Sequence, residues 1–422
     1  MIDERELREM LERRAATISA TPTDAPKAVR RARRRLALNA AVGTLVGLAV
    51  LAGAFAGVRA IQTASPIPAD PTPTPLGPGE VLTVGSRDLI AQDPDSGLVR
   101  EIVDTVTLPE RAEGITSAAW SPDRGWVAFR AGGLWVADTI GGAPRQITAD
   151  LGWSPWAWSP TEDQLVVVLG GDVTLIDAAT GRESDLGTAV GPEDREGYAV
   201  HTLVWSPDGT RIAYDGGPGW GSVYSIDVES GEHTLLVPQP AGTGEINDID
   251  WSPDGTHLAI SYVDASYIAS HKAELGAVWY KATALYLANA DGSDLRLLDR
   301  IVASQWPVWI PRLSVGTAWS PDGTRLAYTS FSGPDHQELQ VWTGSVDGSA
   351  PSLVASRCCL SDGGGPVWSP DGSRMAFESE PPGDLPHHYL VVNADGTGEP
   401  GEIDELLYRS WLGGSYFCYC YG

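Results

Sequence analysis

The sequence contains few of the residues on which small crosslinked or metal-bound domains depend. Its 422 residues include only 4 cysteines and 7 histidines. So few cysteines exclude a disulfide-dense scaffold, and a hydrophobic content of 42% excludes a chain that is disordered throughout. Basic residues are also scarce, with 29 Lys and Arg against 55 Asp and Glu, for a net charge of −26. The length suits two or three domains or one large repeat fold.

The charge is distributed unevenly along the chain. Residues 1–35 hold 10 basic and 6 acidic side chains, whereas residues 60–422 hold 18 basic and 49 acidic ones. A field of that sign repels nucleic acid and anionic lipid headgroups. The acidic part is therefore expected to have a solvated surface that tolerates cationic partners and does not bind nucleic acid.

One stretch lacks charge altogether. Residues 36–58 contain no charged side chain, and a helix of that length would extend about 35 Å, enough to cross a membrane. Six basic residues stand just before it, and only Arg59 follows closely. The positive-inside rule then places residues 1–35, a short basic and partly helical segment, in the cytoplasm. Residues 36–60 are predicted to be a single transmembrane anchor in the cell membrane, with the remainder extracytoplasmic.

Two alternatives concern this anchor. A cleaved signal peptide would use the small residues around Phe55, but the leading region and the apolar run are both long for one. Close approach of two such helices would give a dimer, because the segment contains small residues at four-residue spacing. These pairs are Gly43/Gly47 and Gly53/Gly57. Residues 61–80 are rich in proline and predict an extended linker to the next domain.

Phenylalanine is rare and tryptophan is common, and a repeat accounts for the difference. The chain has 16 Trp against 5 Phe, and six copies of the tripeptide Trp-Ser-Pro recur at intervals of about 40–70 residues. Four of the copies read Trp-Ser-Pro-Asp-Gly in full. The copies begin at Trp120, Trp158, Trp205, Trp251, Trp319 and Trp368, and a degenerate one follows at Trp411.

Each unit predicts four short strands. An apolar stretch ends at the tryptophan, Pro-Asp-Gly makes a tight turn, and a second run such as 212–214 follows. A third run such as 223–226 leads through a second turn to a weaker fourth run. Four strands in about 40–50 residues are typical of a β-propeller blade. No helical periodicity of useful length occurs after residue 62.

These units resemble the TolB-type repeats, a WD-repeat-like propeller family. Similar blades form the N-terminal propellers of prolyl-oligopeptidase-type enzymes. The resemblance covers about residues 81–422 and implies an all-β propeller, but it implies no single function because propellers serve many. The Trp-Asp dipeptide and the Gly-His pair of true WD repeats are missing.

Closure of the ring decides the number of blades. Six complete units start at the six Trp-Ser-Pro sites, and residues 81–105 add two or three strands without a leading tryptophan strand. We expect the C-terminus to supply that strand around 407–411, with 416–421 behind it. The prediction is a seven-bladed β-propeller with a composite closure blade that leaves no open edge, and a six-bladed ring is the alternative.

The longest loops are predicted to emerge on one face. They connect second to third strands, at 263–283, 331–338 and 379–388, or join one unit to the next, at 301–314. Long loops on a rigid scaffold commonly carry binding sites, and exposed aromatic side chains suit sugar rings or peptide side chains. Trp153, Trp156 and Trp220 are expected on this face too. The candidate binding residues are Tyr267, His271, Lys272, Trp279, Tyr280, Trp306, Trp309, Arg312, His336, His387 and His388.

Other motifs that carry chemistry are scarce. The sequence has no Gly-x-Ser-x-Gly elbow and no histidine or cysteine spacing typical of a metal site, so we expect no catalytic residues, metal or cofactor. The four cysteines lie in the part expected to be exported, where disulfides persist. Bridges between the two pairs would staple the ring shut, and a vicinal bond, free thiols or a four-cysteine zinc site are alternatives. The pairs are Cys358/Cys359 and Cys418/Cys420.

Three functions are compatible with these features. The first is a non-enzymatic module that binds an envelope protein, peptide or glycan through the long-loop face. The second is an enzyme, such as a glycan lyase or hydrolase, which would need Asp, Glu or His side chains converging at the mouth of the channel. The third is transmembrane signalling through residues 1–35, in the manner of single-pass anti-sigma-like proteins. The missing catalytic set favours the first.

Overall fold

A computed structural model describes the repeat region of the chain. The described residues are 81–84, 88–93, 99–104, 108, 114–149, 154–191, 200–275, 281–303, 317–332, 338–358, 365–379, 388–404, 407–408, 411 and 416–417. They all belong to one compact unit, Pro73–Gly422. None of the helices formed by these residues has the length and apolar character needed to span a membrane. The expected anchor at 36–60 and the segments on either side of it lie outside them.

The strands form seven antiparallel sheets, six of which contain a four-stranded meander in chain order. We number these six sheets blades 1 to 6. Blade 1 contains β4 (Ser117–Trp120), β5 (Trp126–Arg130), β6 (Leu134–Asp138) and β7 (Arg145–Thr148), and blade 2 contains β8 (Trp156–Trp158), β9 (Gln164–Leu169), β10 (Asp172–Asp177) and β11 (Glu183–Thr188). Blade 3 contains β12 (Leu203–Trp205), β13 (Arg211–Gly216), β14 (Ser222–Asp227) and β15 (His233–Val237), and blade 4 contains β16 (Ile246–Trp251), β17 (His257–Val263), β18 (Lys281–Asn289) and β19 (Arg296–Ala303). Blade 5 contains β20 (Thr317–Trp319), β21 (Arg325–Ser332), β22 (Glu338–Ser345) and β23 (Ser352–Cys358), and blade 6 contains β24 (Val367–Trp368), β25 (Arg374–Ser379), β26 (His388–Asn393) and β27 (Gly401–Ile403). The seventh sheet contains β1 (Val81–Val84), β2 (Asp88–Gln92) and β3 (Val99–Asp104).

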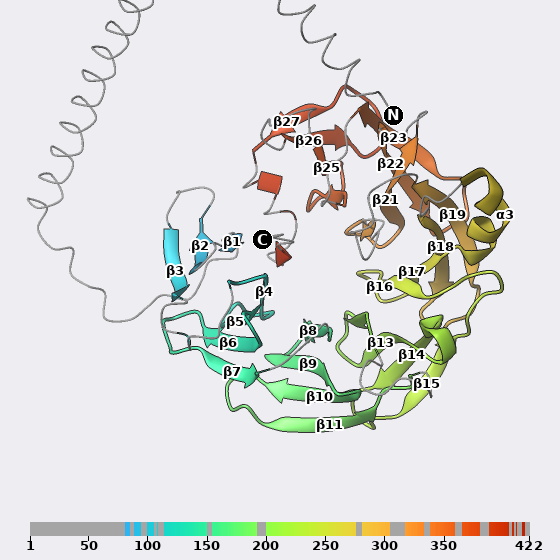
Figure 1. The fold of residues 1–422 in the computed structure, drawn as a ribbon. Helices are drawn as coiled ribbons and strands as arrows, with labels where there is room; N and C mark the ends of the chain where they lie inside the picture. The colour runs from blue at the N-terminus through green and yellow to red at the C-terminus, as the bar shows by residue number, and fades with distance from the viewer. Residues whose placement is uncertain are drawn as a thin grey trace, which may run out of the picture. The chain divides into compact units, whose positions relative to one another are not determined.

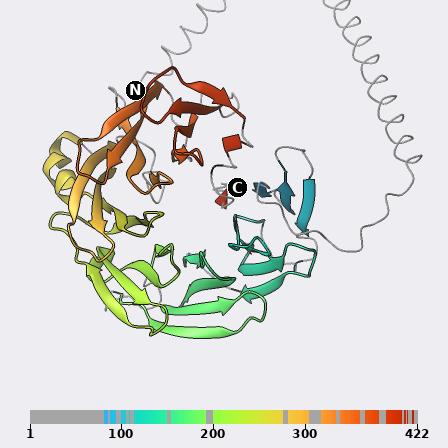
Figure 2. The ribbon, with the colours of Figure 1, turned by 180° about the vertical axis from the view of Figure 1, so that it is seen from behind.

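The sheets stand side by side around a common centre, which is the arrangement of a β-propeller (Figure 1). The first strand of each blade lies nearest the centre and the fourth lies at the rim, as the view from behind also shows (Figure 2). Buried side chains are divided into clusters that lie between successive sheets, such as Trp205 with Val166 or Trp368 with Ala327. The core is thus a set of interfaces between blades, which explains why each repeat needs its neighbours.

The Trp-Ser-Pro-Asp-Gly motif builds the turn between first and second strands, as predicted. In blade 3, Ser206 Oγ donates to Asp208 Oδ1 at 2.6 Å and accepts the N–H of Arg211 at 2.9 Å. Asp208 Oδ1 also accepts the N–H of Thr210 at 3.0 Å. Gly209 adopts a φ of 72°, a conformation that favours glycine. The same pattern recurs in blades 4, 5 and 6 at Ser252, Ser320 and Ser369.

In three of the six blades, the tryptophan of the motif donates a hydrogen bond to the blade before it. The indole Nε1 of Trp158 donates to Ala119 O at 2.9 Å, and that of Trp368 donates to Ala318 O at 2.9 Å. In each case the acceptor is the residue that precedes the tryptophan of the preceding blade. The preceding blade also places an arginine over the indole ring: Arg325 Cζ lies 4.6 Å from the ring centre of Trp368.

The C-terminal segment closes the ring differently from the prediction. Arg374 Cζ lies 5.5 Å from the ring of Trp411, as expected of the tryptophan of a seventh blade. However, the described residues of 407–411 are helical, because Asp404 caps the turn by accepting the N–H of Leu407 at 2.8 Å. The last strand, β28 (Tyr416–Phe417), pairs with β4 of blade 1 instead of completing the sheet of β1–β3. That sheet has three strands in the described part of the chain.

Two substitutions test the tryptophan contact between blades. Trp368 and Trp251 are both buried beneath an arginine, but Trp251 Nε1 has no hydrogen-bond partner among the described residues. Trp368→Phe should therefore lower the free energy of unfolding by about 1 kcal/mol more than Trp251→Phe, because only Trp368→Phe deletes an interblade hydrogen bond. Urea titration of both variants measures the difference, and equal losses would contradict this assignment.

Candidate binding site

The turns between first and second strands and those between third and fourth strands share one side of the ring. The longer connections emerge on the opposite side, which we call the loop face. Two of them carry additional structure, the 3-10 helix η2 (Pro218–Trp220) in blade 3 and the helix α3 (Ala265–Leu275) in blade 4. Among the described residues, the connections of blades 3 and 4 are therefore the most structured part of the loop face.

A histidine and a buried carboxylate meet on the loop face of blade 3. Asp215 is fully buried near the end of β13 and accepts the backbone N–H groups of His201 and Thr202, each at 2.7 Å. His201 Nδ1 lies 2.8 Å from Asp215 Oδ2. Because the carboxylate accepts, His201 Nδ1 is the donor in this contact. The side chain of His201 is 30% exposed, so the orienting contact is buried while the ring reaches solvent.

Trp220 forms one wall beside this histidine. Its ring centre lies 4.9 Å from that of His201 with an interplanar angle of 66°, an edge-to-face arrangement. Trp220 has a φ of 52°, which is unusual for a large side chain and is imposed by a loop with two glycines, Gly217 and Gly219, at positive φ. Backbone strain of this kind is retained mainly where the surrounding structure requires it.

The cluster continues into the first strand of blade 4. Thr202 Oγ1 lies 3.4 Å from Asp248 Oδ1, and Asp248 pairs across the sheet with Ser261 of β17. Ser261 is buried, and its Oγ has no hydrogen-bond partner among the described residues. A buried hydroxyl without a hydrogen-bond partner lowers the stability of the folded state. A polar ligand could supply that partner.

A second carboxylate, Asp250, lies two residues further along β16 and is partly buried. Burial, and to a smaller extent the negative charge of Asp248, together raise the pKa of Asp250 to about 8. In the other five blades, the residue before the tryptophan is alanine or valine. A carboxyl group that is protonated at neutral pH can donate a hydrogen bond as well as accept one.

The helix α3 frames this region on the blade 4 side. Asp264 caps the helix by accepting the N–H of Tyr267 at 2.9 Å, and its other oxygen contacts Arg300 Nη1 at 2.5 Å. Ser266 N–H donates to Gly242 O at 2.8 Å, which attaches the helix to the connection from blade 3. The sequence shows no helical periodicity of useful length after residue 62, and α3 forms without it, because a capped segment that contains several alanines can be helical without an amphipathic pattern.

The predicted binding residues divide into described and undescribed ones. Tyr267 and His271 lie on α3 with their rings stacked, centre to centre at 3.9 Å. Lys272 belongs to the same helix and His388 begins β26, but their side chains are not described. The remaining predicted binding residues lie outside the described part of the chain, namely Trp279, Tyr280, Trp306, Trp309, Arg312, His336 and His387. Cys358 ends β23, and Cys359, Cys418 and Cys420 are likewise outside it.

Sequence reasoning missed the polar members of the cluster. His201, Asp215, Asp248, Asp250 and Ser261 are absent from the predicted set. Comparison of the repeats would have identified Asp250, since it occupies a position that is alanine or valine in every other blade. Asp215 and His201 carry no such signal, because their contact depends on how a connection of variable length folds back.

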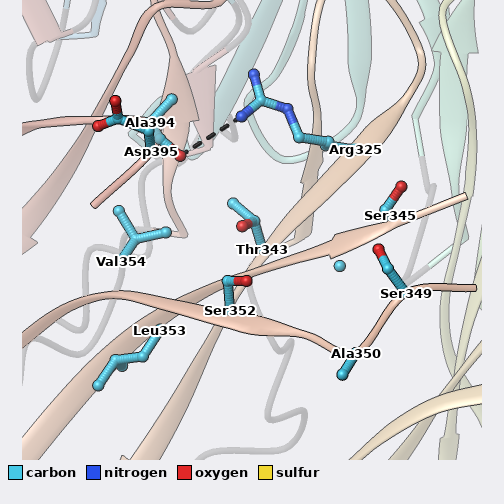
Figure 3. Close-up of a pocket in the computed structure, with 11 residues that line it drawn as sticks. Arg325, Thr343, Ser345, Ser349, Ala350, Ser352, Leu353, Val354, Ala394 and Asp395 are labelled. Carbon is cyan, nitrogen blue, oxygen red and sulfur yellow. Dashed lines mark hydrogen bonds between the residues drawn. The ribbon is translucent and has the colours of Figure 1, made fainter. Parts of the chain in front are cut away.

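A shallow pocket lies away from the loop face, between blades 5 and 6 on the turn side (Figure 3). Its volume is about 220 Å³, and Arg325, Ser345, Leu353 and Asp395 are among its lining residues. Arg325 Nη1 lies 3.4 Å from Ala394 O, which connects the two blades across it. Within the described residues, no group of three or more His, Cys, Asp or Glu side chains is arranged to hold a metal ion.

Comparisons with known proteins give likenesses to solved structures only. No protein-family model matches the sequence, and no curated protein matches it. An oligogalacturonate lyase in complex with manganese is 17% identical with a TM-score of 0.49, covering 78% of this chain and 88% of that one. An oligogalacturonate lyase from Vibrio parahaemolyticus is 16% identical with a TM-score of 0.48, covering 77% and 86%. A candidate TolB protein from Agrobacterium tumefaciens is 17% identical with a TM-score of 0.38, covering 73% and 99%.

These likenesses concern the fold alone and assign no ligand. The predicted β-propeller is confirmed by the arrangement of the described sheets in this chain (Figure 1). Which function the ring serves has to be argued from its own side chains.

The raised pKa of Asp250 predicts how stability depends on pH. A carboxyl with a pKa near 3.9 in the unfolded chain and about 8 in the folded one holds its proton more tightly when folded. The free energy of unfolding should therefore fall as pH rises from about 4 to 8 and level off above. Asp250→Asn should remove this fall.

Asp322→Asn is the control, because hydrogen bonds from Ser320 and Thr324 lower the pKa of Asp322 to about 2. Because the ionised Asp322 stabilises the folded chain above pH 4, Asp322→Asn should lower the free energy of unfolding by a constant amount between about pH 5 and 9, and the difference should shrink as pH falls from about 4 toward 2. Urea titrations at pH 3 to 9 measure both effects. A pH dependence in Asp250→Asn that equals that of the unmodified chain would contradict the assignment.

Proposed function

We propose that this chain is a membrane-anchored, extracytoplasmic β-propeller that binds an envelope glycan, peptide or protein through the loop face of blades 3 and 4. The observation that carries the proposal is the His201 ring, oriented by a fully buried Asp215 and flanked by Trp220. A buried carboxylate that fixes the orientation of a half-exposed ring is the kind of support that functional sites need. The anchor and its topology rest on residues 1–60 of the sequence.

A ligand rich in hydroxyl groups fits the chemistry of this cluster best. Asp248 and Ser261 provide acceptor and donor groups, and Trp220 provides an aromatic edge beside His201. Trp220 is buried and supports the His201 ring edge to face, so a ligand would be held mainly by hydrogen bonds to fixed polar groups. A glycan is therefore favoured over an apolar peptide, and binding rather than chemistry is the principal proposal.

An enzyme is the second candidate, because one observation favours it. Asp250 has a pKa of about 8, in the range suited to general acid–base chemistry at neutral pH, and its neighbour Asp248 contacts the same Thr202 that is bonded to Asp215. A glycan lyase or hydrolase would use such a group for proton transfer. Signalling through residues 1–35 remains a third possibility that rests on the sequence layout alone.

A panel of envelope glycans is first screened for binding to the full-length chain. For any glycan that binds, His201→Ala should weaken the affinity by at least tenfold. The loss follows from removal of a ring that Asp215 holds in place. His257→Ala is the control, because His257 follows a Trp-Ser-Pro-Asp-Gly turn on the opposite side. Unchanged binding in His201→Ala, with a loss in His257→Ala, would move the site to the turn side.

The enzyme candidate predicts that the full-length chain releases new sugar ends from a bound glycan. Asp250→Asn should abolish the release without weakening binding, since the amide keeps the shape of the side chain and loses its proton transfer. Reducing-end and unsaturated-sugar assays measure the products. Binding without any product from the unmodified chain would contradict the enzyme and leave the binding module.

A further inference from the structure

The rim of the propeller carries exposed leucines in three successive blades. Leu235, Leu297 and Leu353 are 49%, 41% and 45% exposed and lie on the outermost strands β15, β19 and β23. All three occupy the same register position, opposite Tyr224, Tyr286 and Trp342 of the third strand, next to a register shift in the strand pairing. Isolated exposed leucines need no explanation, but three at one repeat position do.

The remaining sheets have polar side chains at this position. They are Glu101, Gln146, Asp185 and Glu402, all of them exposed. A leucine is not needed to cover the opposing aromatic ring, because Trp135 is buried opposite Gln146. Polar residues therefore suffice to cover the third strand at this position. The presence of leucine in three blades needs another explanation.

An acidic turn of the following blade stands beside each leucine. Gly292 of blade 4 packs against Leu236 O of β15, and Gly396 of blade 6 lies close to Leu353 O. In blade 5 the corresponding turn contacts β19 through Arg296, which donates to Val346 O. Each of these three turns presents an exposed aspartate at its tip, namely Asp291, Asp347 and Asp395.

These aspartates are ionised at neutral pH. Hydrogen bonds from Ser293, Ser349 and Thr397 hold the pKa values of Asp291, Asp347 and Asp395 below the usual range. The pocket between blades 5 and 6 shows the combination directly, since Leu353 and Asp395 line it together with Ser352 (Figure 3). We call the place where such a turn meets the rim strand of the preceding blade an interblade notch. Each of the three notches thus contains an exposed leucine and an ionised aspartate.

We infer that the rim of blades 3 to 5 is an interaction surface for a protein partner whose contact residues alternate apolar and basic side chains. The charge decides the class of partner. Nucleic acid, anionic lipid and a second copy of this acidic chain would all be repelled. A basic, apolar polypeptide would instead gain burial of the leucines and pairing with the aspartates.

The surface is tested with the full-length chain and two synthetic peptides of equal length, one alternating Lys and Leu and the other alternating Lys and Ser. The Lys–Leu peptide should bind at least tenfold more tightly by calorimetry. The triple variant Leu235→Ser, Leu297→Ser, Leu353→Ser should bind it no better than it binds the Lys–Ser peptide. Replacement of Asp291, Asp347 and Asp395 by Asn should weaken the binding of both peptides. It should also make the affinity less dependent on salt concentration.

The matched control is the double variant Val99→Ser, Ile140→Ser, because these side chains are 52% and 49% exposed outside the three notches. It should bind the Lys–Leu peptide like the unmodified chain, and His201→Ala should do so too because it alters the other face. Equal binding of the two peptides, or an unaffected triple variant with unchanged thermal stability, would overturn the inference. An equal loss of Lys–Leu peptide binding in the Val99→Ser, Ile140→Ser variant would also overturn the inference.

Discussion

The indole of the repeated tryptophan is the contact on which the rest of the ring depends. It ends the first strand of each of the six blades, and in individual blades it donates a hydrogen bond to the preceding blade, as Trp158 and Trp368 do, or lies under an arginine of that blade, as Trp251 and Trp368 do. One side chain therefore fixes both the spacing of neighbouring sheets and the position of the turn that follows it. Because the core is divided into interblade clusters, no blade has a complete core of its own, and stability is shared between neighbours.

The candidate site lies where the repeat departs from its own pattern. The position before the tryptophan is small and apolar in five blades, and in blade 4 it is Asp250. Within the described residues, the indoles of Trp251 and Trp319 at the two flanks of this blade have no hydrogen-bond partner, and the same is true of Trp120 in blade 1. The departure that distinguishes blade 4 is therefore the carboxyl of Asp250, placed on an otherwise regular repeat scaffold.

The fold was predictable because the motif has local physical causes. Proline, aspartate and glycine at fixed offsets specify the turn, and apolar runs of strand length specify the sheets, so the six blades follow from the sequence. The helix α3 and the contact of β28 with β4 were not predictable. The first has no amphipathic stripe, and the second depends on which sheet edge a two-residue strand reaches.

The site itself was predictable only in outline. Loop length predicted that Tyr267, His271 and Trp220 share one side of the ring, and the structure places all three on the connections of blades 3 and 4. The contact of His201 with Asp215 joins residues 14 positions apart through a backbone that folds onto a buried carboxylate, and no spacing rule encodes that geometry. The rim leucines became visible only when strand registers aligned the repeats.

The most direct test of the account is hydrogen–deuterium exchange of the full-length chain with and without a bound envelope glycan. The account predicts that slowed exchange is concentrated at residues 200–202, 217–221 and 246–250, on the loop face of blades 3 and 4. Slowed exchange confined to the Trp-Ser-Pro-Asp-Gly turns, with these segments unchanged, would contradict it.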